Sequence, residues 1–192
     1  AGGDFTEIGG QPRSYIAALD AASGAVTTWD PDASSGVLTL AVAGGTVYAG
    51  GWFTNIGGQP LSRIAALDVI TGAATAWDPG ADSRVTALAV SGGTVYAGGD
   101  FAMFGGLERD NIARITVEGA VDLDWNPGAI GYVYALALTG ETLYAGGWFS
   151  EIGGQERHCI AALDAASGAA TAWDPGADSG VYALAVSGGT VY

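Results

Sequence analysis

The sequence predicts an all-β repeat protein, and three observations support this prediction. The 192 residues divide without a gap into four units, 1–48, 49–96, 97–144 and 145–192, and each unit opens with Ala-Gly-Gly. Every unit contains glycine pairs and a proline, which oppose helices because Gly costs about 1 kcal/mol and Pro about 3 kcal/mol in a helix interior. Short apolar runs bounded by turn residues are typical of buried strands. We therefore expect one repeat domain over residues 1–192.

Four columns keep one residue type in all four units. They are a tryptophan column, a proline column two residues later, a leucine column, and a tyrosine column that closes each unit. The tryptophans are Trp29, Trp77, Trp125 and Trp173, and the tyrosines are Tyr48, Tyr96, Tyr144 and Tyr192. A period of this length is close to that of propeller blades. The fold class predicted is a β-propeller-type repeat of four four-stranded blades.

The second unit and the start of the third illustrate the expected strands. Val85–Val90 is short and apolar and predicts a buried strand, and Thr94–Phe101 follows it across a Ser-Gly-Gly turn. A third strand is predicted at Arg63–Asp68, after the long glycine-rich loop Thr54–Ser62. A fourth is predicted at Ala73–Trp77, because Asp before Pro ends the run. A blade built this way is an antiparallel meander with both faces packed on its neighbours.

The repeat leaves the closure of the ring open. Ala1–Phe5 corresponds to the second half of a strand whose first half corresponds to Thr190–Tyr192. Three arrangements fit: four blades closed in one ring, two chains closed as eight blades, or a part of a larger array that continues into another copy. Unclosed ends expose strand edges and apolar faces, which favours self-association.

The third unit resembles a known module. It contains a Gly-Gly-Asp-Phe start, an Arg-x-x-Ile-Ala-Arg segment and a Trp-Asn-Pro-Gly end. The matching residues are Gly98, Gly99, Asp100, Phe101, Arg109, Ile112, Ala113, Arg114, Trp125, Asn126, Pro127 and Gly128. This pattern resembles the delta-sixty repeat of bacterial β-propellers, and the other three units are similar to kelch blades. The resemblance implies a secreted or cell-surface interaction module, and no functional residues carry over from it.

Composition narrows the range of partners. Six Arg and no Lys stand against 20 Asp and Glu, which gives a formal net charge of −14. Such a charge opposes nucleic acid and anionic membrane surfaces as partners. No apolar run approaches the roughly 18 residues that a membrane span requires. We therefore expect no membrane insertion, and protein or self-association is the favoured interaction.

The position after the glycine pair alternates between Asp4, Trp52, Asp100 and Trp148. A position that accepts Asp is exposed to water, so Trp52 and Trp148 are expected to be partly exposed. Exposed Trp suits stacking on a sugar ring or burial in a protein interface. The alternative is that both indoles only cover the neighbouring loop.

Two further sets of charged residues are candidates for binding. Carboxylates two to four residues apart can bind Ca²⁺, although Asp is also a preferred turn residue; these are Asp78, Asp82, Asp174 and Asp178. A ring of arginines can read an acidic ligand, although each can instead pair with a carboxylate such as Glu108 or Glu156; these are Arg13, Arg109 and Arg157.

The sequence favours a non-enzymatic extracellular scaffold without a cofactor. His158 and Cys159 have no other His or Cys to complete a metal site or a nucleophilic arrangement. A lectin-like module that uses Trp52 and Trp148 is the second hypothesis. An acidic hydrolase is the third, since two carboxylates can suffice for glycoside hydrolysis, but no pair is singled out.

Overall fold

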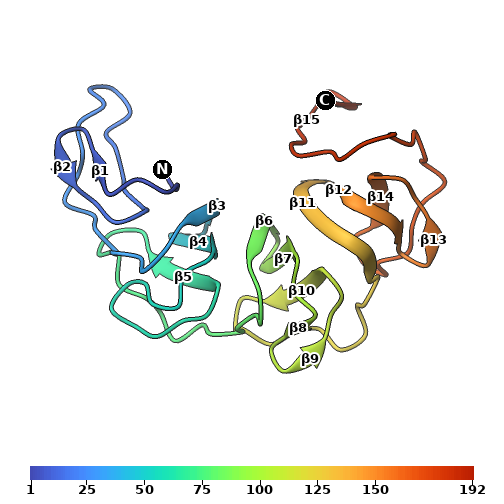
Figure 1. The fold of residues 1–192 in the computed structure, drawn as a ribbon, viewed down its shortest axis with the longest axis horizontal. Helices are drawn as coiled ribbons and strands as arrows, with labels where there is room; N and C mark the ends of the chain where they lie inside the picture. Colours follow the sequence, from blue (N-terminus) through green and yellow to red (C-terminus); the bar gives the residue numbers. More distant parts are fainter.

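The computed structural model describes residues 1–192, and all of its regular elements are strands. The chain forms an open arc of small sheets arranged like the spokes of a wheel, with the two termini facing each other across a gap (Figure 1). No helical segment has the length and hydrophobicity needed to cross a membrane. The strands are β1 (Glu7–Ile8), β2 (Gln11–Pro12), β3 (Val37–Ala43), β4 (Thr46–Gly51), β5 (Ile64–Asp68), β6 (Val85–Ser91), β7 (Thr94–Gly99), β8 (Met103–Phe104), β9 (Leu107–Glu108), β10 (Ile112–Thr116), β11 (Ala129–Thr139), β12 (Thr142–Ile152), β13 (Gln155–Glu156), β14 (Ile160–Asp164), β15 (Val186–Ser187) and β16 (Thr190–Val191).

Three sheets repeat one antiparallel meander, as the sequence predicts. Their strand orders are β3-β4-β5, β6-β7-β10 and β11-β12-β14. The register repeats as well, since Tyr48 pairs with Ala66 in the first sheet and Tyr144 with Ala162 in the third. The sheets straddle the boundaries of the 48-residue units, because each unit begins inside the second strand.

The predicted fourth strand, Ala73–Trp77, is reduced to an isolated bridge. Leu67 pairs with Ala74, and the ladder ends there. The reason is a local hydrogen bond, because the backbone N–H of Trp77 donates to Oγ1 of Thr75 at 3.2 Å. A side chain that accepts a backbone N–H in this way competes with sheet pairing. Each blade is therefore three strands and one bridge.

The closed four-bladed ring is not formed, and each end of the arc carries half a blade (Figure 1). At the N-terminal end, Gly2 pairs with Ile16, and Leu19 pairs with Val26. At the C-terminal end, β15 pairs with β16 and with nothing else. The N-terminal half corresponds to the outer strands of one blade, and the C-terminal half corresponds to its inner strands.

The long loops predicted between the second and third strands are themselves small hairpins. They are formed by β1–β2, by β8–β9, by the end of β12 with β13, and by a bridge between Ile56 and Gln59. The glycine pair at each tip takes the left-handed conformation, with φ of 61° at Gly57 and 78° at Gly58. Two consecutive residues with positive φ match the twist of a tight hairpin, and Gly adopts this conformation without strain.

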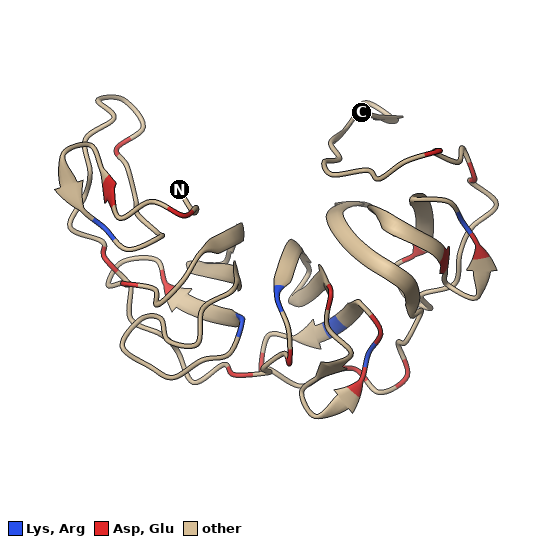
Figure 2. Cartoon of the chain, in the orientation of Figure 1, with Lys and Arg blue, Asp and Glu red and all other residues tan.

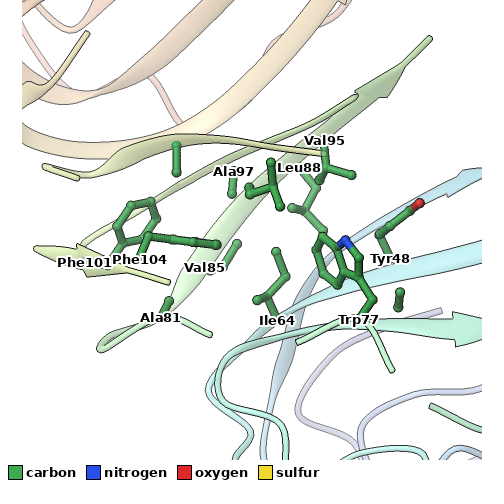
Figure 3. Close-up of a cluster of buried hydrophobic side chains, with 13 residues drawn as sticks. Tyr48, Ile64, Trp77, Ala81, Val85, Leu88, Val95, Ala97, Phe101 and Phe104 are labelled. Carbon is green, nitrogen blue, oxygen red and sulfur yellow. The ribbon is translucent and has the colours of Figure 1, made fainter. Parts of the chain in front are cut away.

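The core lies between neighbouring sheets. In Figure 3, Trp77 and Tyr48 lie together beside Ile64, and Phe101 and Phe104 lie further along the same layer. The Trp77 and Tyr48 rings meet edge to face, with centroids 5.3 Å apart. Trp29, Trp77 and Trp125 are all buried. Three of the four members of the tryptophan column therefore fill the space between blades.

Candidate functional site

Trp52 and Asp100 directly follow β4 and β7, and Trp148 lies inside the longer β12. Together with Asp4 they form the column that follows the glycine pair of each unit. Its position depends on the preceding glycines. A Cβ on Gly147 would lie 2.0 Å from the carbonyl oxygen of Tyr132, so only Gly allows this close approach of the two strands. Trp52 is 40% exposed and Trp148 is 55% exposed, which confirms the predicted exposure of both indoles.

Trp52 is covered by two arginines of its own chain. The guanidinium carbon of Arg84 lies 5.0 Å from the Trp52 ring centroid, and that of Arg63 lies 6.0 Å away. Arg84 Nε also donates to Oδ2 of Asp100 at 2.8 Å, and Ser83 Oγ donates to Oδ1 of the same carboxylate at 2.9 Å. The structure thus joins two members of the predicted column, Trp52 and Asp100, through one guanidinium group.

Trp148 carries no such cover and borders an open hollow of about 660 Å³. Trp148 lies two repeat periods after Trp52, so Gly180 occupies the position that Arg84 occupies beside Trp52, and Cys159 occupies that of Arg63. Neither residue brings a cation to the ring. The hollow is lined by Ile130, Gly131, Trp148, Phe149, Ser150, His158, Cys159, Gly176, Ala177, Asp178 and Ser179.

A tyrosine stack lies beside this hollow and was not expected from the sequence. The rings of Tyr134 and Tyr182 are stacked, with centroids 5.3 Å apart and an interplanar angle of 13°. Tyr132 pairs with Trp148 across β11 and β12, and its ring centroid lies 6.1 Å from that of Tyr134. The signal in the sequence is that Tyr134 and Tyr182 occupy one repeat position in successive units, at which the first two units have Leu38 and Thr86.

The three predicted arginines brace the chain internally. Arg109 is buried, and its Nη2 donates to the carbonyl oxygen of Asp122 at 2.7 Å. The same nitrogen also donates to the carbonyl oxygen of Leu123 at 3.2 Å, and Arg13 and Arg157 make the bonds equivalent to this one, to Thr27 and Thr171. Their carboxylate partners are Asp30 and Asp174, at 3.6 and 3.5 Å, and not the glutamates that the sequence suggested. The guanidinium groups of these arginines donate their hydrogen bonds to backbone carbonyl oxygens of the loop and of the bridge segment. The three arginines therefore do not form a ring that could bind a ligand.

The candidate calcium ligands are not brought into one cluster. No group of three His, Cys, Asp or Glu side chains is placed to hold a metal ion. Asp82 Oδ1 accepts a bond from the backbone N–H of Ala102 at 3.1 Å, and Asp174 pairs with Arg157. Asp178 borders the Trp148 hollow, and Asp78 lies beside the left-handed Gly80.

The aspartates that precede the hairpin turns, Asp20, Asp68 and Asp164, act as caps of those turns. Oδ1 of Asp68 accepts the backbone N–H of Thr71 at 2.7 Å and its hydroxyl at 2.8 Å. These bonds stabilise the carboxylate and hold the pKa of Asp68 below its ordinary value of 3.8. Ser23 and Ser167 do the same for Asp20 and Asp164. Figure 2 shows acidic residues spread along the whole arc, with few basic residues among them.

Comparison with known proteins supports a β-propeller repeat. Residues 93–124, within the second and third units, match a family described as a domain of unknown function (DUF5122) beta-propeller. No curated protein matches the chain.

One solved structure supports the fold, and two others are similar at lower TM-scores. The crystal structure of the computationally designed Ika4 protein matches with a TM-score of 0.60 at 20% identity, over 82% of this chain and 84% of that one. The designed Ika8 protein matches with a TM-score of 0.47 at 20% identity, over 82% of this chain and 54% of that one. BamB from Moraxella catarrhalis matches with a TM-score of 0.44 at 21% identity, over 79% of this chain and 44% of that one. The likeness to Ika4 shows a shared fold and nothing about activity.

Proposed function

We propose that this chain is a non-enzymatic, extracellular interaction scaffold that associates with further copies of itself through its two half-blades. The propeller-type repeat suggests a protein-interaction scaffold in general. The observation that carries the finer proposal is that the edges at the two ends of the arc are complementary. The absence of Lys and the acidic composition support an extracellular location. The complementary edges favour the scaffold over the lectin and hydrolase hypotheses, because neither of these two accounts for them.

The complete blades give the register of the proposed contact. In β4 and β5, Thr46 pairs with Asp68, Val47 with Leu67 and Tyr48 with Ala66. Ala18–Asp20 is the segment equivalent to Ala66–Asp68 of β5, one period earlier. No strand pairs with it on the side where β4 pairs with β5. Two periods after β7, the equivalent segment Thr190–Tyr192 is paired only through its other edge, in the hairpin with β15. We therefore expect Thr190–Tyr192 of one copy to pair with Ala18–Asp20 of the next.

The aromatic contacts within each blade point to the same arrangement, because they join the second strand to the segment after the bridge. Three tyrosine–tryptophan pairs meet edge to face at 5.2 to 5.5 Å; they are Tyr48–Trp77, Tyr96–Trp125 and Tyr144–Trp173. Tyr192 is the fourth tyrosine, is 73% exposed and makes no such contact. We therefore expect Tyr192 to contact Trp29 of a second copy. Burial of this ring and pairing of the strand edge would both favour association.

Sedimentation velocity across a wide concentration range tests the proposal. The chain should form dimers or longer assemblies, and Tyr192→Glu should shift it to the monomer by placing a charge where Trp29 is expected. The matched control is Ile70→Glu, because Ile70 is 83% exposed and lies at a hairpin turn away from both edges. A chain that stays monomeric at every concentration would refute self-association.

A further inference from the structure

We propose that the hollow beside Trp148 binds a guanidinium or ammonium side chain presented by a protein or peptide partner. The proposal deepens the scaffold function, because it names the chemistry of one partner. It concerns the face of an indole and not a strand edge, so the two proposals can fail separately.

The second unit already shows how this column binds a cation. Arg84 lies over Trp52 with its guanidinium carbon 5.0 Å from the ring centroid, and Asp100 holds the same guanidinium through a 2.8 Å bond. An aromatic face and a carboxylate therefore bind one cation between them. Attraction between a cation and the ring quadrupole stabilises such an arrangement.

The fourth unit keeps the indole and lacks both cations. Gly180 and Cys159 occupy the positions of Arg84 and Arg63, and no guanidinium lies near Trp148. The Trp148 side chain is consequently more exposed than that of Trp52, and it borders a hollow of about 660 Å³. An arginine or lysine side chain from a partner would take the place that Arg84 takes beside Trp52.

Charge favours a cation in this hollow. Asp178 lies in its lining, and no hydrogen bond or ion pair from within the chain reaches its carboxylate. The one basic side chain in the lining is His158, and Glu156 lies 3.2 Å from its Nε2. The net charge of −14 adds a long-range attraction for basic partners, which salt screens.

A sugar fits the hollow less well than a cation does. Recognition of a sugar needs several fixed polar groups around the stacked ring. Besides Asp178 and His158, the polar side chains of the lining are the hydroxyls of Ser150 and Ser179 and the thiol of Cys159, and no hydrogen bond within the chain fixes any of these three groups. A guanidinium needs only the ring face and one carboxylate, and the chain itself demonstrates this at Trp52.

Titration with short peptides tests the inference. The probe is an acetylated and amidated Gly-Arg-Gly peptide, and the control probe is the same peptide with neutral citrulline in place of arginine. Indole N–H signals in nuclear magnetic resonance spectra report binding at individual tryptophans. The arginine peptide should shift the Trp148 signal in a saturable way that weakens with added salt, and the citrulline peptide should not.

Four variants sharpen the result. Trp148→Ala should weaken binding about fivefold or more, whereas Trp52→Ala should leave it unchanged, since Trp52 is already covered by Arg63 and Arg84. Asp178→Asn should weaken binding and reduce its dependence on salt. Cys159→Arg should block the site from within the chain, because residue 159 has φ of 62° and Arg63 adopts the same conformation at 69°.

Several outcomes would overturn the inference. Equal binding of the arginine and citrulline peptides would remove the role of charge. Unchanged binding in both Trp148→Ala and Cys159→Arg would place the peptide elsewhere. Binding of neutral oligosaccharides at Trp148 in the absence of any peptide binding would assign the site to glycans.

Discussion

The indole Nε1–H of Trp77 donates a hydrogen bond to the carbonyl oxygen of Thr116, 2.9 Å away in the next sheet. Trp29 makes the equivalent bond to Asp68 at 3.0 Å, one period earlier. Trp125 is the exception, because its Nε1 has no partner and the guanidinium carbon of Arg114 lies 5.6 Å from its ring. Trp29, Trp77 and Trp125 therefore join adjacent blades by packing, and Trp29 and Trp77 do so by a hydrogen bond as well.

Trp77 is expected to be central to stability. Trp77→Ala should lower the free energy of unfolding by about 3–5 kcal/mol, because it removes a large buried ring between two sheets. Trp77→Phe should cost about 1–3 kcal/mol, mainly because it leaves the Thr116 carbonyl without its donor. Urea denaturation followed by circular dichroism measures both. Trp148→Ala is the control, since its ring is more than half exposed, and it should change stability by less than about 0.5 kcal/mol.

A second prediction concerns a column of left-handed residues. Tyr15, Arg63, Asn111 and Cys159 occupy one repeat position, with φ of 66°, 69°, 65° and 62°. Asn tolerates this region better than other residues with a side chain. In addition, Nδ2 of Asn111 donates to the carbonyl oxygen of Ala129 at 2.9 Å.

Cys159→Asn should therefore stabilise the chain by about 1 kcal/mol, through lower backbone strain and an equivalent bond to the carbonyl of Ala177. Thermal unfolding in the presence of a reductant measures the change. Cys159→Val is the control, and it should destabilise the chain because a β-branched residue is strained at positive φ. A lower melting temperature for the Asn variant than for the parent chain would contradict the explanation.

The pH dependence of stability should reveal the ion pair between Arg114 and Asp122. Arg114 Nη2 lies 2.6 Å from Oδ2 of Asp122. Its hydrogen bond is the largest cause that holds the pKa of Asp122 below the ordinary value of 3.8. Because the folded state lowers this pKa, the stability contributed by the carboxylate is fully present above pH 3.8 and is lost as the pH falls through the folded-state pKa.

Asp122→Asn should accordingly be less stable than the parent chain near neutral pH, and the difference should shrink as the pH falls below 3.8. Urea denaturation at a series of pH values measures this difference. If the difference in stability between the variant and the parent chain stays constant into strongly acidic solution, the charge of Asp122 does not contribute to stability.

Much of the blade could be predicted from the sequence. The expected strand Val85–Val90 corresponds to β6, and Arg63–Asp68 corresponds to β5 with one residue fewer. Apolar runs between glycine turns fix such strands locally. The fourth strand was not predictable, because the hydroxyl of Thr75 takes the backbone donor of Trp77. The hairpins within the long loops were also missed, since they are only two residues long on each side.

The candidate site divides in the same way. Sequence alone determined the repeat, the acidic character and the exposure of Trp52 and Trp148, because each depends on which residue occupies which column. Only the tertiary structure decided that the two indoles differ. Arg84 lies 32 residues after Trp52 and meets it only because successive sheets pack side by side, and at Trp148 the same packing brings Gly180, which carries no charge.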